Sequence, residues 1–156
     1  MIVLTFRIAS YWCALRAEAV REIVPLAATC RVPGQPEILE GFLNLRGTLL
    51  PVVRLAVLFG LPCAPMPSSL ILIVKGEAGS VGLLVDEVES VTSATGELRR
   101  IGVGHTATEY AEGELAVEGR NVALLGAEQL LLGEERRRIR ELQGQVQVRL
   151  QALAGS

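Results

Sequence analysis

The chain has 156 residues, half of them hydrophobic, with one Trp, two Tyr and three Phe as its only aromatic residues. This length is enough for one domain with a sizeable apolar core, or for two small subdomains that share one. Seventeen acidic residues against fifteen basic ones give a net charge of −2. The balance excludes the excess positive charge that attracts nucleic acid or anionic lipid, so we expect protein partners.

The cysteines and the N-terminal segment indicate a reducing compartment. Cys13, Cys30 and Cys63 lie far apart and form no CxxC pair, which argues against a zinc site or a thiol-exchange motif. The apolar run over 1–9 is interrupted by Arg7 and is too short for a signal peptide, and no stretch approaches the ~20 apolar residues of a membrane span. We expect a cytoplasmic protein with no membrane insertion, metal or cofactor.

Alternation of side chains predicts three strands at the start of the chain. Two of them, over 2–9 and 11–15, form a hairpin, and a third covers 20–26. In the third strand Glu22 shares a face with Val20 and Val24. The carboxylate lies among apolar neighbours, or it tips toward solvent, and the sequence leaves both interpretations open.

The next pair of strands is joined by a tight turn at Arg46-Gly47. Glycine accepts a positive φ without steric cost, so these two residues suit a hairpin turn into a strand over 48–53. Pro51 has no N–H to donate to a ladder. We therefore expect it at an edge or a bulge, with the sheet open at that point, before a short apolar helix over 55–59.

The second half of the chain repeats this order of elements. Strands are predicted over 70–74, 81–85, 88–92, 114–118 and 121–125, with a glycine turn at Gly119-Arg120 and a short apolar helix over 127–132. The repetition favours two small β-barrels. A terminal helix over 134–153 has an apolar stripe made of Ile139, Leu142, Val146, Leu150 and Leu153.

The sequence offers little for catalysis. His105 is the only histidine, and its loop lacks the third glycine of a dinucleotide motif and the lysine of a P-loop. The adjacent carboxylates Asp86, Glu87 and Glu89 follow a strand, where a solvated strand end explains them. No Ser, His and Asp set can be nominated, so an enzyme is not expected.

Several segments together resemble the CheW family of chemotaxis coupling proteins. They are Val20-Arg21-Glu22-Ile23, the run from Gly41 to Gly47 with its Asn-Leu-Arg-Gly, Pro51-Val52-Val53, the helix closing on Leu58-Phe59-Gly60, Val81 to Asp86, and Leu124 to Leu131. They stand in the family's order and extend over about four fifths of the chain, residues 8–132.

The resemblance implies a mainly β fold and a non-catalytic role. The fold would be two five-stranded SH3-like β-barrels with short helices and a C-terminal amphipathic helix, in one CheW-like domain over 1–156. The barrels would cover about 1–62 and 69–132, with exchange of strands between them left open. The protein would join chemoreceptor tips to the regulatory domain of the histidine kinase CheA, at cytoplasmic arrays beside the membrane. Other CheW-like domains are further candidate partners.

The resemblance also implies two binding surfaces. The receptor-binding groove between the barrels would include Val20, Glu22, Asn44, Arg46 and Leu70. In it, Arg46 would pair with Glu22 above an apolar floor of Val20 and Leu70, unless Arg46 only occupies its turn. The kinase-binding surface would include Pro51, Val52 and Arg54, the last standing where the family usually has an acidic residue.

Two alternatives remain from the sequence. A β-barrel sensor for a small ligand would need a concave apolar pocket with a few polar groups, and the scarcity of aromatic residues counts against it. The scaffold could also serve a pilus-linked or other chemosensory pathway instead of a flagellar one.

Overall fold

The computed structural model describes residues 1–26, 29–62, 65–75, 79–94, 96, 98–99, 111–126 and 133–154, with only the backbone at 133–138 and at Ala154. Within these ranges the chain forms two β-sheets and few helices, so the mainly β fold is confirmed. The expected helix over 127–132 and His105 lie outside the described residues.

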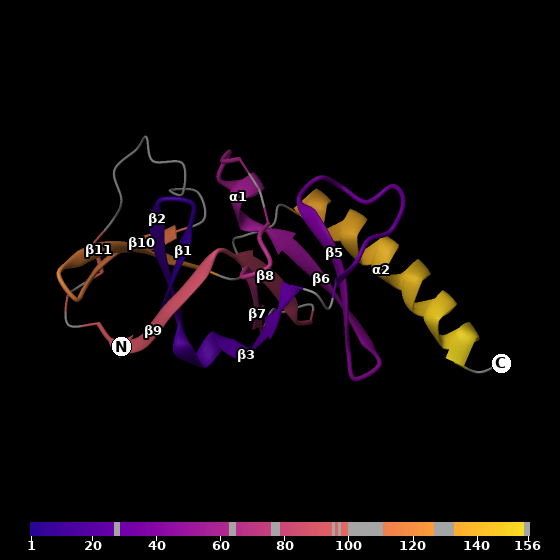
Figure 1. Cartoon of the computed structure of the whole chain (residues 1–156), viewed down its shortest axis with the longest axis horizontal. Helices are drawn as coiled ribbons and strands as arrows, with labels where there is room; N and C mark the ends of the chain where they lie inside the picture. The colour runs from indigo at the N-terminus through magenta and orange to yellow at the C-terminus, as the bar shows by residue number, and fades with distance from the viewer. Residues whose placement is uncertain are drawn as a thin grey trace.

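One sheet has five strands in the order β10-β11-β2-β1-β9 and occupies the left of Figure 1. Its strands are β1 (Ile2–Ile8), β2 (Tyr11–Arg16), β9 (Glu87–Ser93), β10 (Ala111–Val117) and β11 (Arg120–Leu125). The hairpin of β1 and β2 is as expected, and β11 runs parallel to β2. We call it the first sheet.

The second sheet has six strands in the order β3-β7-β8-β6-β5-β4. They are β3 (Val20–Pro25), the two-residue β4 (Thr29–Cys30), β5 (Leu39–Leu45), β6 (Thr48–Arg54), β7 (Leu70–Val74) and β8 (Val81–Val85). The helices are the 3-10 turn η1 (Ala17–Ala19), α1 (Leu55–Leu58) and α2 (Gly133–Ala154). Figure 1 shows α2 running along β5 and β6 toward the C-terminus.

Each sheet takes strands from both halves of the chain. β1 and β2 join the first sheet with β9 to β11, whereas β7 and β8 join the second sheet with β3 to β6. This is the exchange that the division into 1–62 and 69–132 left open; the barrel limits themselves stay a prediction. The exchange follows from η1, which turns the chain out of β2 and into β3 of the other sheet.

A single large core joins the two sheets and the terminal helix. It contains Phe6 and Leu15 from the first sheet and Leu72 and Leu83 from the second, all at most 1% exposed. From α2, Ile139 is buried, and Leu142, Val146 and Leu150 pack against the same cluster, while Leu153 is 75% exposed. The apolar stripe therefore fixes α2 onto the sheets through its first four members.

Both glycine hairpins use the same turn chemistry. Arg46 and Gly47 have φ values of 53° and 88°, with Leu45 opposite Thr48, as a two-residue turn of type I′ requires. The second turn consists of Glu118 and Gly119, with φ values of 48° and 79°. It lies one residue earlier than expected, because glycine takes the second turn position in both hairpins.

The expected open edge at Pro51 is wrong. β6 lies inside the second sheet, between β8 and β5, and Pro51 is buried. The ladder between β6 and β8 begins only at Val52, opposite Gly82. Pro51 stands immediately before that ladder, where no neighbouring strand needs its missing N–H, so an interior strand accepts it.

Candidate functional site

A groove of about 930 Å³ opens on the second sheet beside the tip of the β5–β6 hairpin. Its lining has an apolar part (Leu45, Leu50 and Ile73), a charged part (Arg21, Glu22, Arg46 and Lys75) and small or polar residues (Thr48, Gly79 and Ser80). Leu50 and Ile73 are 5% and 1% exposed and belong to a second hydrophobic cluster on this face of the sheet. The groove thus has an apolar floor and a charged rim.

Arg46 and Glu22 form an ion pair at this rim. The guanidinium Nη2 lies 3.5 Å from the Glu22 carboxylate, and the two side chains are 76% and 35% exposed. The expected pair is therefore present, through one contact rather than a bidentate one. An exposed pair of this length adds little to folding stability, about 0 to 1 kcal/mol, so both charges remain available to a partner.

The backbone at Arg46 is unfavourable for this residue. Its φ of 53° is left-handed, where asparagine or glycine fits better than arginine. Asn44 steadies the turn, because its Oδ1 accepts a hydrogen bond of 2.9 Å from the N–H of Gly47. Glu118 occupies the same position of the second hairpin turn with a φ of 48°, so the type I′ turn sets this backbone conformation whichever residue stands there.

Val20 and Leu70 do not form the groove floor, contrary to the expectation. Both lie on the other side of the second sheet, against the large core. The cause is a register shift between Val20 and Glu22, which pair with the adjacent residues Val74 and Ile73. Such a bulge turns Glu22 to the face opposite Val20, toward the groove. The role of Val20 and Leu70 in receptor binding stays a prediction.

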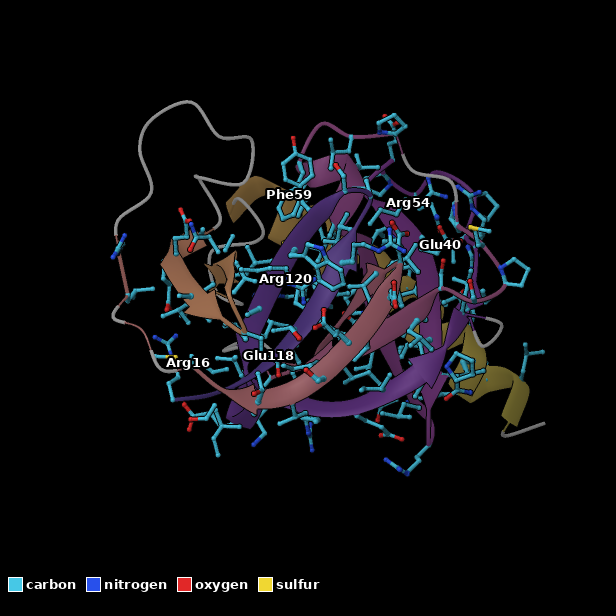
Figure 2. All side chains as sticks on the ribbon, turned by 60° about the vertical axis from the view of Figure 1, so that its left-hand side comes forward. Arg16, Glu40, Arg54, Phe59, Glu118 and Arg120 are labelled. Carbon is cyan, nitrogen blue, oxygen red and sulfur yellow. The ribbon has the colours of Figure 1, made fainter. Side chains whose placement is uncertain are left out.

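The proposed kinase-binding residues lie in the second half of β6, from its central residue Pro51 to its last residue Arg54. Pro51 and Val52 are buried, and Val52 is 0% exposed in the cluster beneath the groove. Arg54 donates from Nε to the Glu40 carboxylate over 2.7 Å, with both side chains 13–15% exposed. Figure 2 shows Arg54 and Glu40 side by side. Arg54 thus has its counter-charge within the chain.

Sequence reasoning missed the groove floor and two of its cations. Leu45 and Leu50 come from the two strands of the hairpin, and Ile73 from β7, opposite Glu22. Alternation along β7 indicates that Ile71 and Ile73 share a face of the sheet. It does not indicate that Glu22 of β3 lies on that same face. Arg21 and Lys75 could have been found only through the pairing of β3 with β7.

Outside the groove, Arg120 and Cys13 have surroundings that explain them without a ligand. The Arg120 guanidinium lies 3.9 Å from the Trp12 ring centroid and pairs with Glu89. Burial raises the pKa of Cys13 to about 12, so that its thiol stays protonated and unreactive at neutral pH. Among the described residues, no three His, Cys, Asp or Glu gather as metal ligands, and no helix is long and apolar enough to span a membrane.

The sequence and the two-sheet fold have counterparts among known proteins. The CheW-like domain matches residues 3–135. The chain belongs to the CheW-like family. A probable chemotaxis protein CheW of Rhizobium etli is 30% identical over 131 residues, covering 81% of this chain and 84% of that protein. The chemotaxis protein CheW of Klebsiella aerogenes is 32% identical over 120 residues, covering 74% of this chain and 72% of that protein.

A solved CheW structure also matches in three dimensions. The scaffolding protein TtCheW of Thermoanaerobacter tengcongensis superposes with a TM-score of 0.77 at 26% identity, over 86% of this chain and 89% of that one. The family match ends near the start of α2, at residue 135. Most of the terminal helix therefore lies beyond the matched residues, although it packs into the same core.

Proposed function

We propose that this CheW-like protein is a cytoplasmic, non-catalytic adaptor that couples chemoreceptors to the regulatory domain of the kinase CheA. The observation that carries the proposal is the groove, with Arg46 and Glu22 at its rim and Leu45, Leu50 and Ile73 as its floor. The similarity of the chain to chemotaxis proteins CheW and to a CheW scaffolding protein supports it.

The groove chemistry fits an amphipathic helix of a receptor tip. The apolar floor matches a helix that buries Leu, Val or Met side chains, the mode of recognition used by helix-in-groove complexes. Three cations, Arg21, Arg46 and Lys75, outnumber the single carboxylate of Glu22 among the lining residues. The rim therefore favours a helix with acidic residues beside its apolar stripe.

Reversal of the charge at Arg46 tests the receptor contact. We expect Arg46→Glu to weaken binding of a soluble receptor cytoplasmic fragment at least about tenfold, because two carboxylates then face each other at the rim. Binding of a CheA regulatory domain should change little. Arg149→Glu, at an exposed arginine on α2, is the matched control and should leave both affinities intact. Undisturbed receptor affinity in Arg46→Glu would exclude this groove.

The kinase contact is proposed at the other end of the hairpin, around Pro51, Val52 and Arg54. Since Pro51 and Val52 are buried, they would act by shaping the surface, and Arg54 would meet the partner. Arg54→Asp alone would set two carboxylates together. The double variant with Glu40→Arg and Arg54→Glu keeps an ion pair at this place but exchanges the positions of its two charges. Association rates with the CheA domain at low and high salt should differ from wild type.

The pathway served by the adaptor depends on its partner. A receptor of a flagellar array and one of a pilus-linked array would both present a helical tip to the same groove. Co-purification of the chain with receptors of its own cell, with Arg46→Glu as the negative control, would identify the array. A thermal shift with a small metabolite and no protein partner would instead favour a sensor.

A further inference from the structure

The terminal helix α2 is attached to the hairpin that carries Arg46. Two glutamines one helical turn apart, Gln143 and Gln147, reach the backbone of β6. Gln143 Nε2 donates to the carbonyl of Leu49 over 2.5 Å, and Leu49 donates its N–H to Gln147 Oε1 over 3.0 Å. Both backbone groups of one strand residue are thus bound by the helix.

The register of the hairpin explains why Leu49 is free to bind α2. Leu45 and Thr48 close the two-residue turn and exchange hydrogen bonds, so the next pair, Asn44 and Leu49, is a non-hydrogen-bonded one. The N–H and carbonyl of Leu49 therefore point away from β5. The neighbouring β8 pairs with β6 only from Val52 onward. The glutamine side chains occupy the place that a strand would take.

Gln147 also holds the turn itself. Its Nε2 donates to the carbonyl of Gly47 over 3.2 Å, directly after Arg46. The other side of the turn is held by Asn44, whose Oδ1 binds the N–H of Gly47. Gly47 is therefore fixed through both of its backbone polar groups, which restricts the left-handed backbone of Arg46 and the direction in which the guanidinium leaves the sheet.

We propose that Gln147, supported by Gln143, is a positioning residue that couples α2 to the groove by holding the Arg46-Gly47 turn. This inference rests on the proposed function, because the groove is taken as the receptor site. The helix is firmly seated, since Ile139, Leu142, Val146 and Leu150 pack into the core shared by both sheets. It therefore forms a rigid support for a hairpin tip that extends into solvent. The inference assigns a task to a helix most of which lies beyond the matched domain.

A double-mutant cycle on receptor affinity tests the coupling. We expect Gln147→Ala to weaken binding of a soluble receptor cytoplasmic fragment about three- to tenfold, the scale of a lost hydrogen bond. In an Arg46→Ala background the same change should have no further effect on affinity. Gln145→Ala is the matched control, because Gln145 is an exposed glutamine on the same helix. It should bind as the wild type does in both backgrounds.

Two partner-free measurements complete the test. Gln147→Ala should speed amide exchange at Leu49 and shift the resonances of the Gly47 amide and the Arg46 Nε–H, whereas Gln145→Ala should change none of them. Wild-type affinity in Gln147→Ala, despite faster exchange at Leu49, would reduce Gln147 to a structural contact and overturn the inference. Equal loss in both Arg46 backgrounds would overturn it as well. If the wild type binds no receptor fragment, the proposed function fails, and unchanged Arg46 and Gly47 resonances would then refute the positioning separately.

Discussion

The β5–β6 hairpin carries an arginine at each end that pairs with a glutamate, and the two pairs differ in distance and in exposure to solvent. At the tip, Arg46 meets Glu22 of β3 over 3.5 Å, with the arginine 76% exposed. At the base, Arg54 meets Glu40 over 2.7 Å, with both side chains at most 15% exposed. The first pair lies at the rim of a groove, and the second is closed within the fold.

The contrast separates an ion pair that solvent reaches freely from one that the fold largely encloses. A nearly buried pair is costly to break, because the remaining charge keeps its desolvation penalty without its partner. An exposed pair is cheap to break, so a partner can take over either charge. The same two residue types therefore give a fixed base and an adaptable tip on one hairpin.

The largest expected change in stability comes from the core that both sheets share. Leu72 is 0% exposed, and we expect Leu72→Ala to lower the free energy of unfolding by about 2 to 5 kcal/mol through lost burial and a cavity. Denaturant unfolding measures the loss. Val148→Ala, at a residue 66% exposed on α2, is the control and should change stability little. A near-neutral Leu72→Ala would mean that the two sheets do not share this core.

The base pair should give the next largest effect. We expect Arg54→Ala to cost about 2 to 3 kcal/mol, since Glu40 is left nearly buried and unpaired. Removing both charges with Glu40→Ala and Arg54→Ala should cost less than the sum of the single losses. Urea unfolding of the four proteins measures the coupling. Strictly additive losses would show that Arg54 and Glu40 do not stabilise the fold through their contact with each other.

The tip should give the smallest change in stability. Arg46→Asn loses an exposed ion pair but gains a residue suited to positive φ, so we expect a net change within about 0.5 kcal/mol. Receptor binding should nevertheless weaken, because the guanidinium is gone. Gly47→Ala, at φ 88° with open space around its added Cβ, should cost about 1 kcal/mol from the backbone alone. If Arg46→Asn lost stability but still bound receptor, the pair at the tip would serve folding and not recognition.

Local chemistry predicted the tip of the hairpin well. Arg46-Gly47 is a turn because only glycine accepts its φ without strain, and that rule needs no tertiary information. The pairing of Glu22 with Arg46 came from the family resemblance, and the structure brings the two side chains together. What could not be read was the bulge after Val20, which no local pattern marks and which decides the face of Glu22.

Long-range pairing explains the other errors. Pro51 was expected at an open edge because a proline cannot donate, but the start of the β8 ladder at Val52 places the missing N–H where nothing requires it. The membership of β1 and β2 in a sheet with β9 to β11 likewise depends on contacts between distant segments. Alternation identifies a strand and its two faces, not its neighbours.

A charge exchange between Arg46 and Glu22 shows whether the two side chains together form the receptor contact at the groove. Affinity for a receptor cytoplasmic fragment is measured for the wild type, Arg46→Glu, Glu22→Arg and the protein carrying both changes. We predict that Arg46→Glu weakens binding at least about tenfold and that adding Glu22→Arg recovers part of the loss. Losses that add in the double variant, or an Arg46→Glu variant that binds as the wild type does, would show that this pair is not the receptor contact.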